Sequence, residues 1–268
     1  MTPNGRVRAE VEIGTRIGHA NAHRVTVRDL DLVDDLIGQV SYAELTLLAI
    51  TGKRPPPGAI RVVDAILVSL MDHGLTANAL AARLNYWVAP EAIQAAVATG
   101  LLGAGSRLLG SMEGCGRLLT EIRSDIDDEG TPERDAVRNR IRELLDAGER
   151  VPGIGHSLHR SGDPRAAKLL EVARREGHAT RYVPLVELIP EVLAELTGKT
   201  LPLNATGAIG ALLLEVGVPW PLHRGFALMS RTAGLVAHVG EEIENPLTPE
   251  IRKALRKISW IEDEVEDE

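Results

Sequence analysis

Residues 203–217, LNATGAIGALLLEVG, and residues 221–243, PLHRGFALMSRTAGLVAHVGEEI, predict two helices separated by a short turn. Alanine, leucine and glutamate, which favour helix, supply much of both segments. The same pattern recurs upstream in PGAIRVVDAILVSLMDHG, ALAARLNYW, PEAIQAAVATGLLGAG, TPERDAVRNRIRELLDAG, PRAAKLLEVARREG and VPLVELIPEVLAELTG. Aromatic residues make up 3% of the chain, too few for a typical sheet core. We therefore expect an all-α fold.

The N-terminal segment follows a different pattern. RVRAEVEI (6–13) and RVTVR (24–28) alternate charged or polar residues with apolar ones, which is the period of half-buried strands. We expect residues 1–29 to form an N-terminal extension with a short β-hairpin. From Leu30 onward, in DLVDDLIGQVSYAELTLLAITG, apolar residues recur at three- and four-residue steps, and Gly52 is a natural helix stop.

The composition limits the class of protein. The chain has 268 residues, of which 44% are hydrophobic, so it can bury a sizeable core, and its net charge of −8 argues against a nucleic-acid partner. Cys115 is the only cysteine, which excludes an intrachain disulfide and favours a reducing compartment. The N-terminus lacks the apolar core of a signal peptide, and charged residues interrupt the apolar runs. We expect a soluble, cytoplasmic protein with no membrane partner.

Charge density indicates two helical domains. LTEIRSDIDDEGTPERDAVRNR (119–140) is more charged than its neighbours. We expect residues 119–183 to form a small helical domain that closes over a site, and residues 30–118 and 184–258 to form a large one. The acidic end, residues 259–268, is expected to be a solvated tail.

Polar groups are concentrated in the glycine-rich run VPGIGHSLHRSGDPRA (151–166). A turn requires glycine and proline, but it does not require His156, His159, Arg160 and Arg165 so close together. A basic, solvated loop is one interpretation. The other is a local site for an anionic substrate, in which arginine binds carboxylates and histidine polarises a carbonyl or hydroxyl group.

Two further residues are candidates for the same site. Arg231 lies inside an apolar helical segment and needs a partner, which is either a substrate carboxylate or an acidic side chain such as Glu241. His73, in MDHGL, is either a substrate ligand or a cap at a helix C-terminus. The eight histidines show no metal-ligand spacing, and the chain has no GxxxxGK[ST], HExxH or GxSxG motif, so no catalytic metal is predicted.

The run PGIGHSLHRSGDPRA closely resembles the PG(F/I/Y)GH…DPR signature of the citrate synthase superfamily. VSLMDHGL resembles the earlier DH segment of that family, and LNATG with ALMSRTAGLVAHVGEEIENP resembles its C-terminal segment, so the resemblance covers roughly residues 30–247. The short chain and GAGSRLLGSMEG make it most similar to citryl-CoA lyases and the lyase module of ATP-citrate lyase. The resemblance implies an all-α homodimer, or a higher homo-oligomer, with a large and a small domain and a site in the cleft between them.

The resemblance also implies roles for individual residues. His73 would contact the oxaloacetate-derived part of the substrate, and His156 would hydrogen-bond its carbonyl or the citryl hydroxyl. Arg165 and Arg231 would hold carboxylates of a di- or tricarboxylate. The coenzyme A of an acyl-CoA substrate would contact the residues Arg160, Gly153 and Gly155.

The chain departs from the family pattern at two positions. Citrate synthases have a histidine at about the position of Leu108, where lyase-type members have an apolar residue, so this departure favours a lyase. Thr206 replaces the aspartate that moves a proton on the acetyl carbon. A threonine hydroxyl is not a carboxylate base near neutral pH, so it would position water, or another acid such as Glu113 would substitute.

These observations leave three candidate functions. The first is cleavage of citryl-CoA, or a related 3-hydroxyacyl-CoA, to acetyl-CoA and oxaloacetate or another 2-oxo acid. The second is another reaction of a CoA thioester on the same scaffold, either a citrate-synthase-like acyl transfer or a hydrolysis. The third is regulation by a non-catalytic protein that binds carboxylates and CoA.

Overall fold

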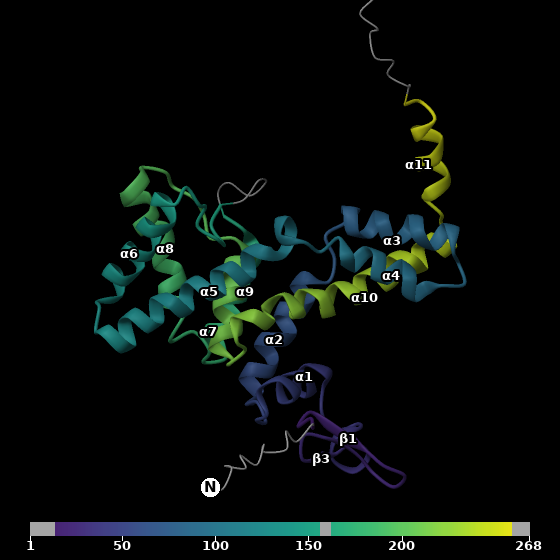
Figure 1. Ribbon diagram of the computed structural model, residues 1–268, viewed down its shortest axis with the longest axis horizontal. Coiled ribbons are helices and arrows are strands. Elements are labelled where there is room, and N and C mark those ends of the chain that lie inside the picture. The colour runs from purple at the N-terminus through teal and green to yellow at the C-terminus, as the bar shows by residue number, and fades with distance from the viewer. Residues whose placement is uncertain (1–13, 156–161, 259–268) are drawn as a thin grey trace, which may run out of the picture. The chain divides into compact units, whose positions relative to one another are not determined.

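The computed structural model describes residues 14–155 and 162–258, apart from the side chains of residues 106–109. It is built of helices with one small sheet, which confirms the all-α fold (Figure 1). The α-helices are α1 (Tyr42–Thr51), α2 (Pro57–Leu70), α3 (Ala77–Val88), α4 (Ile93–Leu102), α5 (Ser106–Glu129), α6 (Glu133–Asp146), α7 (Pro164–Arg175), α8 (Val183–Thr197), α9 (Ala205–Glu215), α10 (His223–Glu244) and α11 (Thr248–Leu255). None of the helices in the described ranges is long and apolar enough to span a membrane.

The chain divides into two compact units, Met1–Ile60 and Arg61–Glu268. This boundary lies within α2, at a different place from the predicted domain limits. The division into a large domain of residues 30–118 and 184–258 and a small domain of residues 119–183 stays a prediction. The acidic tail, 259–268, lies outside the described residues.

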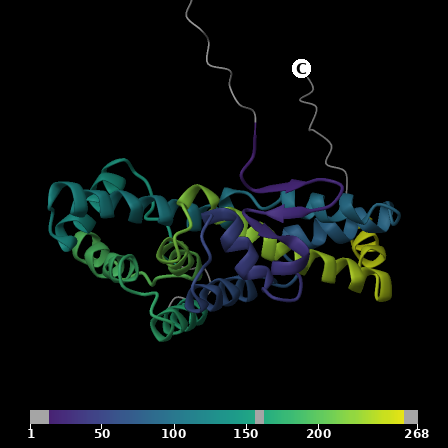
Figure 2. The same cartoon turned by 90° about the horizontal axis from the view of Figure 1, so that it is seen from below.

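The N-terminal unit contains an antiparallel sheet of β1 (Gly18–Ala20), β2 (Val25–Val27) and β3 (Leu30–Asp31). Figure 2 shows its antiparallel strands. Gly18 is opposite Val27, and Val27 is opposite Leu30. The predicted strand 24–28 and a short N-terminal hairpin are therefore confirmed, and the partners of this strand are residues 18–20 and 30–31. The other predicted strand, 6–13, lies outside the described residues.

The helix predicted from Leu30 onward begins later than expected. Asp31 accepts hydrogen bonds from the amides of Val33 and Asp34, and this cap starts a separate short π-helical turn, η1 (Leu32–Leu36). The α-helix proper, α1, begins after Ser41, whose hydroxyl accepts the Glu44 amide. Its predicted stop is confirmed, because Gly52 ends the helix in the left-handed conformation.

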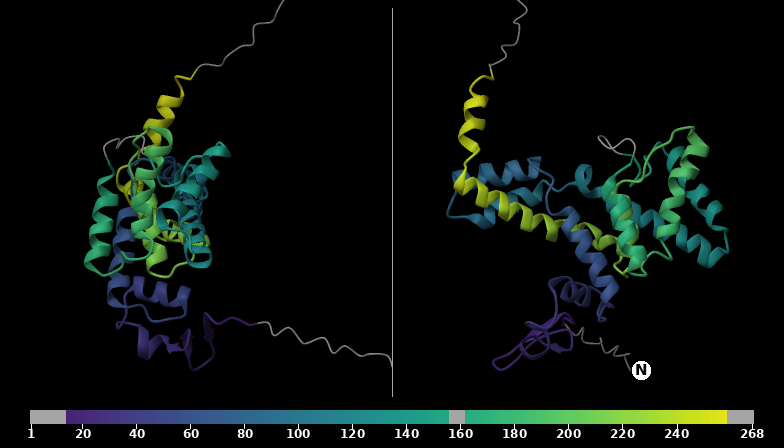
Figure 3. Two further views of the ribbon diagram at one scale, coloured as in Figure 1. Left: turned by 90° about the vertical axis from the view of Figure 1, so that its left-hand side faces the viewer. Right: turned by 180° about the vertical axis from the view of Figure 1, so that it is seen from behind.

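In the second unit, α9 packs against α5, and residues without side chains make this close approach possible (Figure 3). A Cβ atom on Gly210 would lie 2.9 Å from the Met112 carbonyl oxygen. Cys115, on the facing side of α5, is fully buried, and burial raises the pKa of its thiol to about 12. This cysteine is therefore a packing residue and not a nucleophile.

A second group of helices in the same unit consists of α3, α4 and α10, which pack against one another (Figure 3). Arg83 of α3 is buried against α10, where its Nε and Nη1 atoms lie 2.6 Å from carboxylate oxygens of Glu242 and Glu241, respectively. If the two helices packed differently, Arg83 or its glutamate partners would be left as uncompensated buried charges. The ion pair therefore favours this packing of α3 against α10. The pair fixes the C-terminal end of α10 against α3.

Candidate active site

The segment before His156 is held against the start of α9 by backbone hydrogen bonds. Gly155 N–H donates to the Pro202 carbonyl at 2.7 Å, and Asn204 N–H donates to the Gly153 carbonyl at 3.0 Å. Gly153 has φ +83°, and a Cβ atom on it would lie 2.6 Å from the Cα of Gly207. Its lack of a side chain is therefore required by the contact with α9, and the proposed contact of Gly153 with coenzyme A stays a prediction.

Asn204 connects this segment to Thr206, and our reading of the sequence missed it. Its Nδ2 donates to the Gly155 carbonyl at 2.8 Å, while its Oδ1 accepts the Thr206 hydroxyl at 2.7 Å and the Gly207 amide at 3.0 Å. The available signal was its place at the start of the helical segment predicted over residues 203–217, because asparagine is a preferred N-cap. The Thr206 hydroxyl thus donates its proton in a hydrogen bond to Asn204.

Arg165 is held by Asp163, which precedes it in the DPR sequence. The Asp163 carboxylate accepts the Arg165 amide at 3.0 Å, its Nε at 3.1 Å and its Nη2 at 3.0 Å, and it also accepts the Ala205 amide at 3.0 Å. Burial raises the pKa of Asp163, but its bonds to the Arg165 side chain and to the amides of Ala205 and Arg165 outweigh burial and lower it to about 2. Asp163, ionised at neutral pH, therefore joins α7 to α9 and orients the Arg165 guanidinium.

His156 and Arg160, together with His159, lie outside the described residues, so their predicted roles stay predictions. Leu108 belongs to α5, and its side chain is likewise outside the description.

Arg231 and His73 belong to a second group of residues, where α10 passes the end of α2. Arg231 Nη1 lies 3.9 Å from Asp72 Oδ1. This acid is the neighbour of Arg231, whereas Glu241, the partner that the sequence suggested, pairs with Arg83. Burial lowers the pKa of Arg231, and the Asp72 carboxylate opposes that shift. Within the described residues, the buried Nη1 atom of Arg231 has no hydrogen-bond partner, so it has capacity left for a ligand.

Asp72 organises the turn that carries His73. Its carboxylate accepts the Gly74 amide at 2.8 Å and lies 2.9 Å from His238 Nε2. The Gly74 amide lowers the pKa of Asp72, burial opposes this, and the His238 ring lowers it further. His73 itself is exposed and follows the end of α2 by three residues, so it lies beyond the helix terminus that it was suggested to cap.

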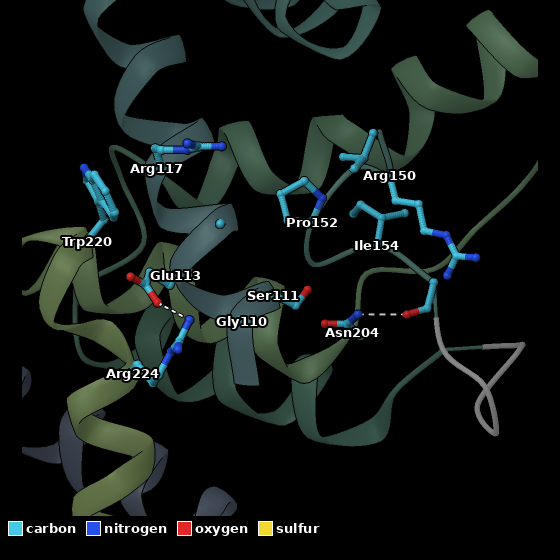
Figure 4. Close-up of a pocket in the computed structure, with 13 residues that line it drawn as sticks. Gly110, Ser111, Glu113, Arg117, Arg150, Pro152, Ile154, Asn204, Trp220 and Arg224 are labelled. Carbon is cyan, nitrogen blue, oxygen red and sulfur yellow. Dashed lines mark hydrogen bonds and ion pairs between the residues drawn. The ribbon is translucent and has the colours of Figure 1, made fainter. Parts of the chain in front are cut away.

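A cavity of about 830 Å³ lies between the start of α5, the 150–155 segment and the start of α10 (Figure 4). Its lining residues are Gly110, Ser111, Glu113, Gly114, Arg117, Arg150, Val151, Pro152, Ile154, Gly155, Asn204, Trp220 and Arg224. Glu113 and Arg224 point toward one another, with Glu113 Oε2 2.6 Å from Arg224 Nη2. The Ser111 hydroxyl accepts the Gly153 amide at 2.6 Å.

A second, more apolar cavity of about 580 Å³ shares Arg150, Val151, Ile154 and Gly155 with the first. Leu145, Leu193 and Leu201 line it, and Lys199 adds a cation. Gly155 thus borders both cavities, whereas Gly153 is packed behind them. The two cavities thus adjoin at residues 150–155.

The structure thus gathers the predicted site residues into two groups. One contains Gly153, Gly155, Arg165 and Thr206, and the other contains His73 and Arg231. No hydrogen bond or ion pair joins the two groups within residues 14–155 and 162–258. Across the same residues, no three histidine, cysteine, aspartate or glutamate side chains are grouped to hold a metal ion.

Comparison with known proteins agrees with these features. Residues 15–254 match the family model of the citrate synthase C-terminal domain. Citrate synthase 2 of Bacillus subtilis is 28% identical over 209 residues, which are 76% of this chain and 52% of that protein. The chain thus spans about half the length of this curated relative.

Solved structures extend the comparison. A citryl-CoA lyase from Hydrogenobacter thermophilus superposes with a TM-score of 0.84 and 29% identity, over 96% of this chain and 97% of that one. An ATP citrate lyase from Methanothrix soehngenii, in complex with citrate and coenzyme A, has the same fold in part of its chain, with a TM-score of 0.76, 20% identity, and coverage of 97% of this chain and 43% of that one. With the family model matched over most of its length, the chain belongs to the citrate synthase family.

Proposed function

We propose that this protein is a citryl-CoA-lyase-like enzyme that cleaves citryl-CoA, or a related 3-hydroxyacyl-CoA, to acetyl-CoA and oxaloacetate or another 2-oxo acid. The observation that carries the proposal is the nearly complete mutual coverage with the Hydrogenobacter thermophilus citryl-CoA lyase. The citrate synthase of Bacillus subtilis is matched over only about half its length. From the family resemblance we also propose a cytoplasmic homodimer or higher homo-oligomer.

The adjoining cavities support coenzyme A as part of the substrate. Arg150 borders both of them, and Arg117 and Lys199 add positive charge at one cavity each. Phosphates need such cations, while an adenine or pantetheine group needs the apolar surface supplied by Ile154. The Methanothrix soehngenii enzyme, which shares the fold, holds citrate and coenzyme A.

The environments of Arg165 and Arg231 support the proposal that these residues bind the carboxylates of the substrate. The Arg165 guanidinium is oriented by Asp163 and keeps a partly exposed side chain, while Arg231 keeps a buried Nη1 atom without a hydrogen bond among the described residues. A preorganised guanidinium loses little side-chain entropy when it binds a carboxylate. In this proposal each arginine holds one carboxylate, and His73 contacts the 2-oxo acid portion.

The chemistry requires a base at the hydroxyl group of the substrate. In this proposal His156 accepts that proton, the carbon–carbon bond breaks, and its electron pair moves onto the acetyl thioester as an enolate. The enolate then takes up a proton on carbon to give acetyl-CoA. The net reaction moves one proton from oxygen to carbon and consumes no other reactant.

A second candidate function follows from Thr206. Because the Thr206 hydroxyl donates to Asn204 and is not an acid near neutral pH, the scaffold is also compatible with acyl transfer or hydrolysis of another CoA thioester. A non-catalytic protein that binds citrate and CoA would need no proton donor at all.

The test incubates purified protein with citryl-CoA, and separately with acetyl-CoA plus oxaloacetate, while mass spectrometry follows the product acids and thiols. We expect acetyl-CoA and oxaloacetate from citryl-CoA, abolished activity in His156→Ala, and a higher rate in Thr206→Asp, which adds a carboxylate. Binding of citrate or CoA without turnover would favour the regulatory function. Unchanged rates in both variants would contradict the roles of these two residues.

A further inference from the structure

The cavity beside Asn204 contains an ion pair that the reaction described above does not use. We propose that Glu113 is the catalytic acid–base that moves the proton on the acetyl carbon, an inference that rests on the proposed lyase function. Of the described ionisable side chains that line this cavity, Arg117, Arg150 and Arg224 are permanently charged, and Glu113 is a carboxylate. A carboxylate can both accept and return a proton near neutral pH, and a guanidinium cannot.

The position of Glu113 matches this task. It lies on α5 and faces the same cavity as Asn204, whose side chain accepts the Thr206 hydroxyl (Figure 4). The carboxylate therefore borders the space next to the turn in which Thr206 stands. Thr206 carries no carboxylate and its hydroxyl proton is directed to Asn204, so in this proposal another group, Glu113, supplies the proton to carbon.

The Glu113–Arg224 pair is not saturated by hydrogen bonds. The side chains are 26% and 33% exposed, and Glu113 Oε2 lies 2.6 Å from Arg224 Nη2. Even so, Glu113 Oε2 and Arg224 Nε are buried atoms without a hydrogen bond of normal geometry among the described residues. Buried polar atoms of this kind call for a partner, and the cavity offers room for one.

The titratable groups nearest to Glu113 are Arg224 and His223. His223, at the start of α10, is fully buried, and burial lowers its pKa, although the carbonyls of Val218 and Met112 and the Glu113 carboxylate oppose this. A neutral His223 leaves Arg224 as the cation in contact with Glu113. Arg117, one turn along α5, is exposed and lies 3.9 Å from Glu121. In the proposed cycle Glu113 takes up a proton from solvent before each transfer.

The proton balance closes without another reactant. Breaking of the carbon–carbon bond leaves its electron pair on the carbon next to the thioester carbonyl. The protonated Glu113 gives its proton to that carbon, forms the methyl group of acetyl-CoA and returns to the carboxylate. The base at the substrate hydroxyl releases its proton to solvent, which restores the proton that Glu113 took up.

The experiment compares wild type, Glu113→Gln and the control Glu121→Gln, which changes an exposed glutamate of the same helix that does not line the cavity. Citryl-CoA cleavage is measured, together with exchange of the acetyl-CoA methyl protons in D₂O in the presence of oxaloacetate. We expect Glu113→Gln to slow both by roughly 10²- to 10⁴-fold, the usual effect of a positioned acid or base. Glu121→Gln should match wild type in both assays.

Two further variants make the assignment specific. Glu113→Gln should slow cleavage less in the Thr206→Asp background than in wild type, because Thr206→Asp supplies a second carboxylate next to Asn204, which lines this cavity. Glu113→Asp keeps a negatively charged carboxylate beside Arg224, so it should fold and retain an intermediate rate even where Glu113→Gln does not fold. Wild-type rates in a folded Glu113→Gln variant, or an inactive Glu113→Asp variant, would overturn the role of Glu113. Either result would leave the proposed lyase function standing. A wild-type protein with neither cleavage nor exchange would overturn the proposed function as well.

Discussion

Asp163 shows how much a single buried carboxylate contributes to this site. It accepts hydrogen bonds from the Arg165 side chain and from the amides of Arg165 and Ala205, and its side chain is fully buried. The Asp163 side chain therefore has two roles. It orients Arg165, which is proposed to bind a substrate carboxylate, and it ties α7 to the start of α9.

We expect Asp163→Asn to lower the free energy of unfolding by about 2 kcal/mol at neutral pH, since each unit of pKa shift corresponds to about 1.4 kcal/mol. The folded-state pKa of about 2 lies below the ordinary value of 3.8, so the stabilisation is present above pH 4 and is lost as the pH falls toward 2. Urea unfolding of both proteins at several pH values measures it. A difference that grows as the pH falls would contradict this assignment.

At the scale of elements, the site depends on where α10 meets the end of α2. A Cβ atom on Gly234 would collide with the carbonyl oxygen of Met71, directly before Asp72 and His73. The Ser230 hydroxyl donates to the Leu67 carbonyl on the same side of α10. This close approach brings Arg231 within 3.9 Å of Asp72.

We expect Gly234→Ala to push the 71–74 turn away from α10, which would destabilise the protein by roughly 1–3 kcal/mol and raise KM for citryl-CoA. Gly240→Ala is the matched control, because it lies on the same helix with nothing within 4 Å of its added Cβ, and it should stabilise by roughly 0.5–1 kcal/mol. Thermal unfolding and steady-state kinetics measure both effects. Equal behaviour of the two variants would show that the contact does not position the turn.

At the scale of the whole molecule, ligand binding should be visible as stability. A ligand that binds only the folded protein stabilises it by about 2.7 kcal/mol at 100 times its Kd, which for a chain of this size corresponds to roughly 5–10 °C in Tm. We expect coenzyme A to produce such a shift. Arg150→Gln, at the border of both cavities, should reduce it, and Arg142→Gln, an exposed residue that lines neither cavity, should not. A Tm that coenzyme A leaves unchanged would argue against the proposed substrate class.

Local sequence patterns were sufficient for the helical class of the fold, the N-terminal hairpin and the Gly52 helix stop. Those features depend on side-chain periodicity and on backbone conformations that glycine adopts easily, and both act within a few residues. The late start of α1 shows the limit of that reasoning. Apolar spacing alone did not reveal that the Asp31 cap begins a separate turn.

The sequence by itself determined the family, through the residues 151–166 and the segments around His73 and Arg231, and it determined that Arg231 needs a partner. Only the tertiary structure decided that this partner is Asp72, that Asn204 engages Thr206, and that Glu113 and Arg224 meet in one cavity. The physical reason is the range of the interactions. A helix cap or a turn is specified by neighbours in the chain, whereas an ion pair between α5 and α10 exists only after the helices have packed.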